Sequence, residues 1–379
     1  MSIHLDEDLR AIARQTAEYV EKEIVPRAEG WEEEGRVPRD VLRAMGELGF
    51  FGLRVPEEWG GVGLGPLASV VFAEQLGRST FGGFTITVLA HTDLAMPYIT
   101  RFASPEMKRR FLPAMVAGHS IGGLAVTEPD AGSDVAGIRT TARRDGDGYV
   151  INGTKMFITN GAAGDVMVVA AKTDLAVKGS RGISMFVVER GTEGFAVGRN
   201  LHKMGWRSSD TAELAFTDCY VPADNLIGDE NRGFYYIMEN FQNERLVLAG
   251  QALGEAQRAL ELTVEHARGR TVFGTSLWDM QAVRQRLAMD QARLDAARQL
   301  TYHAAWLESR EEDSVRAVSE VKALVGELVN QILYDCVQFH GGMGYMAETA
   351  VERMYRDARI QSIGGGATEV MLEEVAKRL

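Results

Sequence analysis

Residues 149–159 read Tyr-Val-Ile-Asn-Gly-Thr-Lys-Met-Phe-Ile-Thr, and they place β-structure in the middle of an otherwise helical chain. Two apolar runs, at 149–151 and 155–159, flank the dipeptide Asn152-Gly153. An Asn-Gly pair between apolar runs is the strongest short-range signal for a two-residue hairpin turn. The segment therefore predicts two antiparallel strands that meet at Asn152-Gly153.

The region around this hairpin, residues 118–228, is predicted to form a small sheet. Apolar runs typical of short strands recur at 166–171, 183–188 and 214–216, with glycine-rich or polar segments between them. No long helical pattern separates these runs. That favours a small antiparallel sheet or barrel over βαβ units.

The residues on either side of this region are predicted to be helical. Within residues 1–117, a helix over 41–48 is followed by Gly49, which is a typical helix stop. Within residues 229–379, long amphipathic stretches with few breakers indicate helices; they cover 234–268, 277–309 and 315–338. The expected fold class is α+β, mainly α, with the order helices, strands, helices.

The composition disfavours several classes of function. The chain has 379 residues, with 53 acidic and 41 basic side chains and a net charge of −12. An acidic protein lacks the basic face that sequence-independent binding to nucleic acid needs. No run of about 18 apolar residues is present, and the first ten residues lack a secretory signal, so we expect neither a membrane span nor export. A cytoplasmic enzyme is the expectation.

The cysteine and histidine patterns predict neither a disulfide nor a metal site. Cys219 and Cys336 lie too far apart in sequence to suggest a disulfide framework. The seven histidines show no metal-ligand spacing. Residues 60–65 are rich in glycine but lack the preceding strand and the fixed spacing of a dinucleotide-binding fingerprint, so we interpret them as a loop.

One carboxylate interrupts an apolar stripe on the first helix of the C-terminal region. Spacings of four, three and four residues place on one face Ile237, Phe241, Glu244 and Leu248. Glu255 and Glu261 are instead assigned to the exposed face. Glu244 has two interpretations: a partly exposed side chain paired with a cation, or a catalytic base whose pKa is raised by apolar surroundings. Periodicity alone does not choose between them.

A segment at 124–134 is a candidate for contact with a ligand. It combines small residues with the hydroxyl groups of Thr127 and Ser133, which are able to line a planar, polar ligand. The alternative is a turn-rich loop at the edge of a domain.

Two glycine-rich segments near the C-terminus are further candidates. In residues 338–345, Gly341 and Gly342 either end a helix or let a phosphate or sugar approach the backbone. Residues 363–369 precede a last helix, and we expect Thr368 to cap it.

Taken together, these segments resemble the acyl-CoA dehydrogenase family. Residues 125–134, Ala-Val-Thr-Glu-Pro-Asp-Ala-Gly-Ser-Asp, are similar to the first signature of that family. Residues 338–345, Gln-Phe-His-Gly-Gly-Met-Gly-Tyr, are similar to the second. Other matching segments and positions are 152–160, 205–211, 270–281, Glu348, Arg353 and Asp357. The likeness runs in one register from about residue 56 to the C-terminus.

This resemblance implies an N-terminal helical bundle, a middle β-domain and a C-terminal four-helix bundle. It also implies one FAD per subunit, held between the middle and C-terminal domains and shared with a neighbouring subunit. Around the flavin ring the resemblance places Thr127, Ser133, Phe157, Ile158 and Thr159. Towards the pyrophosphate and adenosine end it places Arg270, Gln281, Gln338, Phe339, His340, Gly341 and Gly342 of the adjacent subunit. Further cofactor-binding positions that it implies are Leu124, Ala125, Val126, Phe273, Thr368 and Glu369. Arg270 suits phosphate because a guanidinium binds two phosphate oxygens at once.

The reaction implied is the α,β-desaturation of an acyl-CoA thioester to the trans-2-enoyl-CoA. In the family a carboxylate removes the α-proton while the β-hydrogen leaves as hydride to flavin N5. The thioester carbonyl is polarised by a flavin ribityl hydroxyl and by a backbone N–H that maps to Gly365. Candidate substrate contacts are Ser133, Ser180, Tyr235, Gln242, Asn243, Arg245, Gly365 and Gly366.

The position of the base departs from the majority of the family. Most members carry it in a Glu-Gly-Thr segment of a late loop, where this chain has Gly365, and Ala367 stands where Thr is usual. A minority, resembling isovaleryl-CoA and long-chain acyl-CoA dehydrogenases, carry it in a Glu-Arg-Leu segment on a helix. Residues 244–246 read Glu-Arg-Leu here, so resemblance and helical spacing both indicate Glu244 as the base.

The partners implied are an acyl-CoA substrate, an electron-transferring flavoprotein and further copies of the chain. A shared FAD site makes a dimer the minimum, and we expect a tetramer. Gly364 and Gly365 leave room beside the acyl site, which suits a branched or a long chain. The alternatives are a flavin-dependent oxidase or monooxygenase on the same fold, or a non-catalytic acyl-CoA-binding protein; the presence of Glu244 argues against the last.

Overall fold

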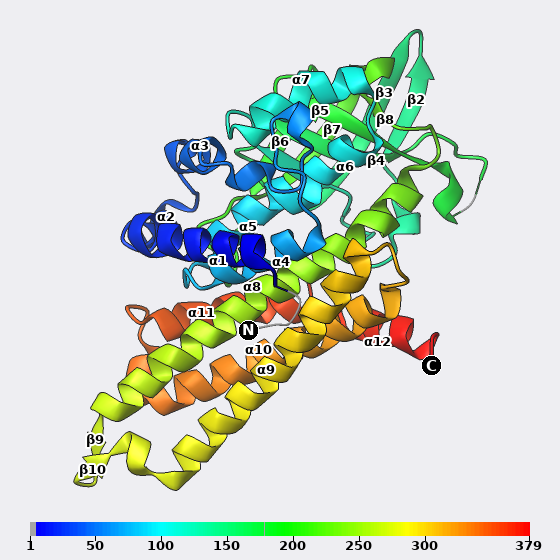
Figure 1. The fold of residues 1–379 in the computed structure, drawn as a ribbon. Helices are drawn as coiled ribbons and strands as arrows, with labels where there is room; N and C mark the ends of the chain where they lie inside the picture. The colour runs from blue at the N-terminus through cyan, green and yellow to red at the C-terminus, as the bar shows by residue number, and fades with distance from the viewer. Residues whose placement is uncertain (1–4, 178) are drawn as a thin grey trace.

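The computed structural model describes residues 5–177 and 179–379. In Figure 1 the N-terminal helices occupy the middle of the molecule, with the β-sheet above them and the C-terminal helices below. Along the chain, helices are followed by strands and then by helices, as the sequence predicts. None of the helices in the described ranges is long and apolar enough to cross a membrane.

The N-terminal region is a cluster of short helices. The predicted helix over 41–48 is confirmed as α3, and Gly49 follows it with a φ of +83°, a left-handed conformation that ends the helix. A π-helical stretch, Ala90–Ala95, joins α5 to α6. The α-helices are α1 (Glu7–Tyr19), α2 (Ala28–Glu34), α3 (Arg39–Glu47), α4 (Pro66–Gly77), α5 (Gly82–Leu89), α6 (Met96–Phe102) and α7 (Pro105–Val116).

The middle region forms one eight-stranded sheet in the described chain. Its strand order is β6-β7-β3-β2-β4-β5-β8, and most neighbours are antiparallel, as predicted. β1 pairs with β4 in parallel, so the sheet is not antiparallel throughout. The strands are β1 (Gly122–Ala125), β2 (Thr141–Asp145), β3 (Gly148–Thr159), β4 (Val166–Lys172), β5 (Ile183–Glu189), β6 (Phe195–Asn200), β7 (Thr211–Pro222) and β8 (Leu226–Ile227).

The predicted hairpin turn at Asn152-Gly153 is wrong. β3 runs through both residues without a break, and the register against β7 shifts there as a β-bulge. Asn152 uses its side chain to bridge to Asp218, donating from Nδ2 to Oδ1 (3.1 Å) and accepting from the backbone N–H (2.8 Å). The β2–β3 turn lies earlier, at Gly146, whose φ is +57°. Pairing with strands on both sides therefore overrides the local turn signal.

The C-terminal region is dominated by α8, a helix of 37 residues. It begins against the sheet, since a Cβ on Gly233 would lie 2.8 Å from the backbone of Ser184, and it ends at the far tip of the bundle (Figure 1). The predicted helices over 277–309 and 315–338 are confirmed, the first beginning slightly later. The elements are α8 (Gly233–Gly269), β9 (Thr271–Val272), β10 (Thr275–Ser276), α9 (Gln281–Ser309), α10 (Val315–His340), α11 (Ala350–Ala358) and α12 (Thr368–Ala376).

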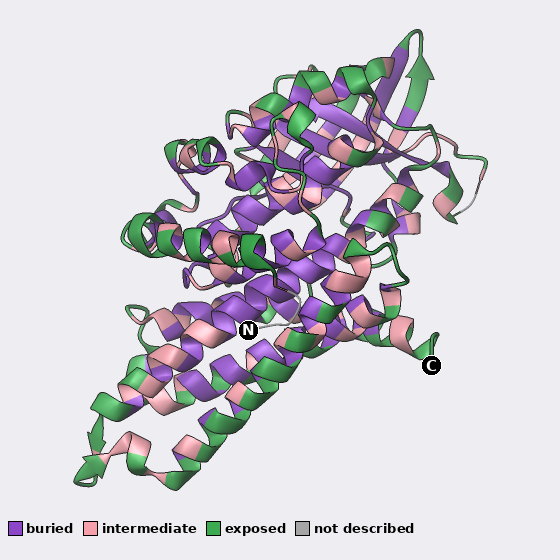
Figure 2. Cartoon of the chain, in the orientation of Figure 1, coloured by how far each residue is buried: buried purple, intermediate pink, exposed green. Residues whose placement is uncertain are grey.

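Two predictions on these helices are wrong. Glu255 was assigned to an exposed face but is 1% exposed, and Gln251 Nε2 donates to its carboxylate at 2.7 Å. The reason is that α8 is covered by α4 on one side and α10 on the other, so its middle has no exposed face (Figure 2). Thr368 does not cap α12 but is its first residue, and its hydroxyl donates to the backbone oxygen of Ser362 at 3.5 Å.

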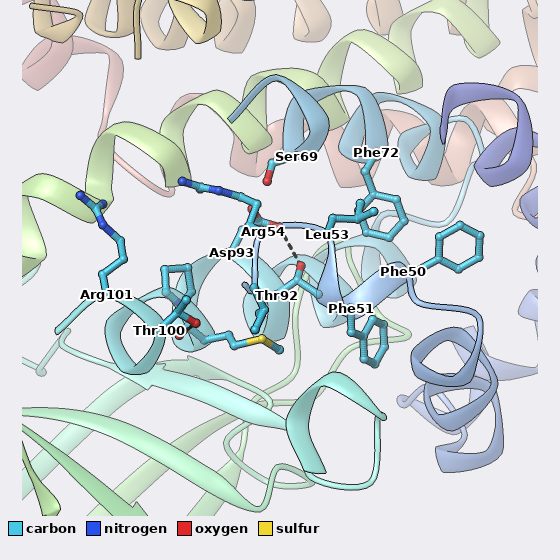
Figure 3. Close-up of a pocket in the computed structure, with 13 residues that line it drawn as sticks. Phe50, Phe51, Leu53, Arg54, Ser69, Phe72, Thr92, Asp93, Thr100 and Arg101 are labelled. Carbon is cyan, nitrogen blue, oxygen red and sulfur yellow. Dashed lines mark hydrogen bonds between the residues drawn. The ribbon is translucent and has the colours of Figure 1, made fainter. Parts of the chain in front are cut away.

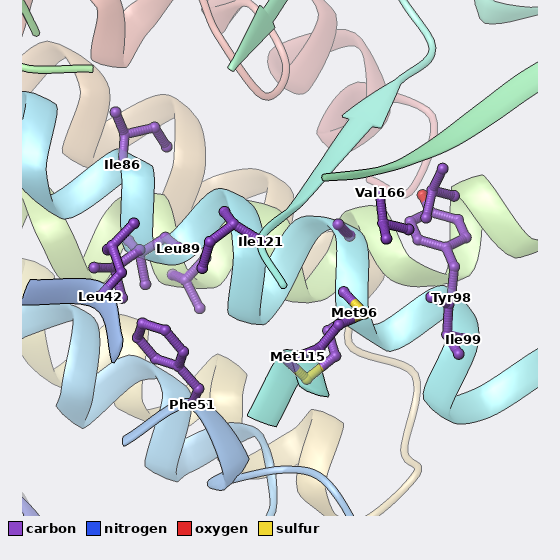
Figure 4. Close-up of a cluster of buried hydrophobic side chains, with 14 of the residues drawn as sticks. Leu42, Phe51, Ile86, Leu89, Met96, Tyr98, Ile99, Met115, Ile121 and Val166 are labelled. Carbon is purple, nitrogen blue, oxygen red and sulfur yellow. The ribbon is translucent and has the colours of Figure 1, made fainter. Parts of the chain in front are cut away.

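A hydrophobic core joins the N-terminal helices to the sheet (Figure 4). Met96 of α6 and Met115 of α7 lie in this core with Ile121 and with Val166 of β4. Tyr98 is fully buried in the same core, so its ring has little freedom to move. The prediction of no disulfide is confirmed, because Cys219 and Cys336 are both buried free thiols.

Candidate active site

Glu244 is buried in the first third of α8. The apolar helix face predicted to contain Glu244 is confirmed, because Ile237 and Leu248 are buried and Phe241 is half-buried. Glu244 itself is 5% exposed. The interpretation of an exposed carboxylate paired with a cation is therefore excluded, and the carboxylate lies in the environment that a base requires.

Two neutral donors hold the carboxylate of Glu244. Asn240 Nδ2, one turn earlier on α8, donates to Oε1 at 3.0 Å, and Tyr98 Oη donates to the same oxygen at 3.4 Å. Among the described residues no group donates to Oε2.

Burial raises the pKa of Glu244 to about 8, because the charged form loses its hydration. The hydrogen bond from Asn240 and the nearby charge of Arg245 act in the opposite direction but do not cancel this effect. A carboxyl group with a pKa close to neutral pH is well matched to taking up and releasing a proton.

This pKa predicts how stability depends on pH. Between about pH 5 and 8 folded Glu244 keeps a proton that the unfolded chain has lost, so the free energy of unfolding falls as pH rises. One such group contributes about 1.4 kcal/mol per pH unit. Urea unfolding of substrate-free protein over this range is expected to show a shallower fall for Glu244→Gln than for wild type. Identical slopes would contradict the raised pKa.

The turn of α8 that carries Glu244 is tied to the N-terminal helices through Asp93. The backbone oxygen of Asp93 accepts from Asn240 Nδ2 (3.2 Å) and from Asn243 Nδ2 (3.3 Å), and its Oδ1 also accepts from Asn243 (3.2 Å). Asp93 lines a pocket together with Arg54 and Arg101 (Figure 3). These contacts fix α8 against the stretch between α5 and α6.

The glycine loop, residues 364–366, lies against α8 within a turn or so of Glu244. Gly365 has a φ of +65°, and a Cβ built there would lie 2.3 Å from Leu248 Cδ1. A Cβ on Gly366 would lie 3.5 Å from Arg245 Nε. A side chain at position 365 would therefore require Leu248 to shift and would be strained by the positive φ.

The segments predicted to surround a flavin ring are brought together beside β3. Lys155 Nζ donates to the backbone oxygen of Val126 (3.0 Å), and Met156 N donates to that of Thr127 (2.9 Å). Phe157 has a φ of +61° and is 65% exposed. An aromatic ring held in solvent on a strained backbone fits a partner with a flat apolar face.

Ser133 and Ser180 lie on adjoining segments of the same domain. Ser133 is exposed and precedes the short helix Val135–Gly137, which packs against the short helix Gly179–Gly182 that carries Ser180. The other predicted substrate contacts lie on α8 or in the glycine loop: Tyr235, Gln242, Asn243, Arg245, Gly365 and Gly366.

A second set of predicted FAD residues lies at the opposite end of α8. His266 stacks on His340 at 4.3 Å, which places the end of α8 beside the end of α10, and Phe273 is 98% exposed between β9 and β10. Arg270 follows Glu244 by 26 residues, or about 39 Å along a helix. Within one chain, Arg270 and the end of α10 therefore lie far along α8 from Glu244.

Three residues of this site were not predicted from the sequence: Asn240, Tyr98 and Asp93. Asn240 lies four residues before Glu244, so helical spacing offered a signal for it. Tyr98 and Asp93 precede Glu244 by more than 140 residues, and no local pattern links them to it.

Sequence models of the N-terminal, middle and C-terminal domains of acyl-CoA dehydrogenases match residues 6–119, 123–219 and 231–379. The mitochondrial long-chain specific acyl-CoA dehydrogenase of Sus scrofa is 40% identical over 95% of this chain and 84% of its own length. The mitochondrial isovaleryl-CoA dehydrogenase of Pongo abelii is 36% identical over 97% and 87%. A solved structure of a probable acyl-CoA dehydrogenase from Mycobacterium abscessus superposes with a TM-score of 0.96, at 41% identity and 99% coverage of both chains.

The fold and these matches define the class of protein as a flavin-dependent oxidoreductase. The chain belongs to the acyl-CoA dehydrogenase family, whose members use FAD.

Proposed function

We propose that this protein desaturates the α,β-bond of an acyl-CoA thioester, with Glu244 as the base that removes the α-proton. The observation that carries the proposal is a carboxylate at 5% exposure, which the described residues hold through Oε1 alone, beside an exposed glycine at position 365. FAD, when bound, would supply the two-electron acceptor for the β-carbon–hydrogen bond.

The residues of this chain fit FAD at two places. Thr127, Ser133 and residues 157–159 would surround its ring system, where the exposed ring of Phe157 offers a flat apolar surface. Arg270 and residues 338–342 would hold the pyrophosphate and adenosine end of an FAD in a second copy of the chain. The length of about 39 Å along the helix from Glu244 to Arg270 supports this sharing, and with it a dimer as the minimum assembly and a tetramer as the fuller one.

The chain's own groups account for the proton transfer. Glu244 Oε2 accepts the α-proton while Asn240 and Tyr98 keep the carboxylate oriented through Oε1. Gly365 is exposed, and no described residue accepts from its backbone N–H, so this donor is free to bind the thioester oxygen. Polarising the carbonyl stabilises the negative charge that develops as the α-proton leaves.

The proposal also includes the class of acyl chain and the electron acceptor. We expect a branched or long acyl chain, because Gly364 and Gly365 add no side-chain bulk beside Glu244. The names of the relatives, long-chain and isovaleryl, point the same way. Electrons would pass to an electron-transferring flavoprotein.

The test is the visible spectrum of the purified protein, followed without oxygen while single acyl-CoAs are added. The flavin band is expected to bleach with branched short-chain or with longer straight-chain acyl-CoAs, and an electron-transferring flavoprotein is expected to restore it. A bound flavin that no acyl-CoA reduces would overturn the proposal in favour of an oxidase or monooxygenase. A colourless protein that does not take up FAD would leave a binding role.

A further inference from the structure

Lys322 on α10 binds the glycine loop through two backbone carbonyl groups. The residue is 2% exposed. Its Nζ donates to the backbone oxygen of Gln361 at 2.6 Å and to that of Gly366 at 3.1 Å. These two carbonyl groups lie on either side of residues 362–365, so one ammonium group closes the loop that contains Gly365.

No carboxylate in the described part of the chain pairs with the charge of Lys322. No ion pair formed by the described residues includes it, and burial together with the charge of Arg245 lowers its pKa to about 8. A buried ammonium group without a carboxylate is costly, and an apolar side chain would fill the same space without that cost. The two charge-assisted hydrogen bonds to the loop are the interactions that offset it.

Lys322 and Leu248 both border Gly365. A Cβ on Gly365 would lie 3.7 Å from Lys322 Cε and 2.3 Å from Leu248 Cδ1. Lys322 therefore sets how far Gly365 approaches the turn of α8 that follows Glu244. A shift of the loop away from Lys322 would move the backbone N–H of Gly365 relative to the carboxylate.

We propose that Lys322 is a positioning residue for the reaction: by tying both ends of the glycine loop it holds the Gly365 N–H where the thioester oxygen binds. This inference rests on the proposed function above. Lys322 acts through Gly365 and has no contact of its own with the substrate. Misplacement of a transition-state donor by about 1 Å costs up to about 100-fold in rate.

The first test is Lys322→Met in the FAD-loaded protein. Because the donor stays in the chain but loses its support, flavin reduction is expected to slow by about 10- to 100-fold. Affinity for the acyl-CoA is expected to change by less than about threefold, since the ground state gains little from this donor. Stopped-flow reduction over a range of acyl-CoA concentrations separates the two effects.

A substrate analogue isolates the proton-transfer step. An acyl-CoA with sulfur in place of the β-carbon loses its α-proton but has no β-hydrogen to give, so the bound enolate accumulates and absorbs at long wavelength next to the oxidised flavin. Weaker polarisation of the carbonyl makes the α-proton less acidic. The pH midpoint of this band is expected to rise by about one unit in Lys322→Met, matching a tenfold loss of acidity. An unchanged midpoint would overturn the proposal.

Asn330→Ala is the matched control. Asn330 also lies on α10 and donates from Nδ2 to two backbone oxygens, those of Gly326 (2.7 Å) and Ala358 (3.0 Å), but it does not contact the glycine loop. The pH midpoint of the enolate band in Asn330→Ala is expected to equal that of wild type. An equal rise in both variants would attribute the effect to α10 as a whole and overturn the role of Lys322.

Hydrogen exchange of the backbone amides of residues 363–367 tests, without any substrate, whether Lys322 holds the glycine loop in place. Lys322→Met is expected to exchange faster there than wild type, whereas Lys322→Arg, which keeps charged donors, is expected to be closer to wild type. An unchanged exchange rate in Lys322→Met would show that Lys322 does not hold the loop and would overturn the inference. This result does not depend on whether an acyl-CoA reduces the wild-type flavin, so the failure of this inference is distinct from the failure of the proposed function. If Lys322→Met does not fold, Lys322→Gln takes its place, and a wild-type midpoint and exchange rate in that variant overturn the proposal.

Discussion

Glu244→Gln is expected to bind FAD and acyl-CoA as wild type does and to lose flavin reduction. Glutamine has nearly the shape of glutamate and keeps an oxygen for the hydrogen bonds from Asn240 and Tyr98, but it does not accept the α-proton. General base catalysis contributes roughly 10²- to 10⁴-fold, so we expect at least about a 1000-fold loss. Anaerobic single-turnover reduction measures the rate, and the shift of the flavin band on acyl-CoA addition measures binding.

Glu255→Gln is the matched control for this experiment. Glu255 also lies on α8, is buried, and has a pKa raised to about 8 by burial, but its carboxylate faces Gln251. Its removal is expected to leave flavin reduction within about threefold of wild type, because a buried carboxyl alone does not make a base. A wild-type rate of flavin reduction in Glu244→Gln would contradict the assignment of Glu244 as the base. So would an equal loss in both variants, since that would indicate a general effect of buried charge on α8.

Lys155→Met is expected to destabilise the protein by about 3–5 kcal/mol, because it leaves a buried carboxylate without its partner. Lys155 is fully buried on β3, and its Nζ lies 2.7 Å from Glu128 Oε1. The same amine donates to the backbone oxygen of Val126, so this pair fastens the first signature segment to the sheet. The free energy of unfolding in urea is the measurement, and FAD retention is expected to fall with it.

The double variant Glu128→Gln/Lys155→Met separates the charge from the packing. With both charges gone, no carboxylate is left unpaired, and the loss of stability is expected to be smaller than in Lys155→Met alone. Additive losses would show that the two side chains act independently, contrary to their contact. Glu128 Oε1 also accepts from the backbone N–H of Thr140, at 3.0 Å, so a neutral glutamine still has a partner there.

Several features of this protein were readable from local patterns in the sequence. The order of helices and strands follows from periodicity and from residues such as Gly49, which end an element through their own backbone preferences. The placement of Glu244 on an apolar stripe follows from helical spacing alone, because residues three and four apart share a face wherever the helix packs. Its role as a base remains a prediction for the experiment above.

Other features were decided only by tertiary structure. The signal at Asn152-Gly153 favours a turn, but β2 and β7 pair with β3 and keep it one continuous strand through a bulge. Glu255 fits an exposed face by spacing, yet α4 and α10 enclose that part of α8. In both cases contacts between segments distant in sequence outweigh a local preference worth about 1 kcal/mol or less.

Part of the site was likewise predictable from the sequence, and part was not. The sequence by itself determined that a carboxylate interrupts an apolar helix face and that a run of glycines precedes the last helix. Only the tertiary structure decided that Tyr98 reaches Glu244, that Gly365 meets Leu248, and that Lys322 closes the glycine loop. The physical reason is that local sequence sets backbone conformation and the periodicity of faces, whereas burial, pKa and the meeting of distant donors and acceptors depend on how those faces pack.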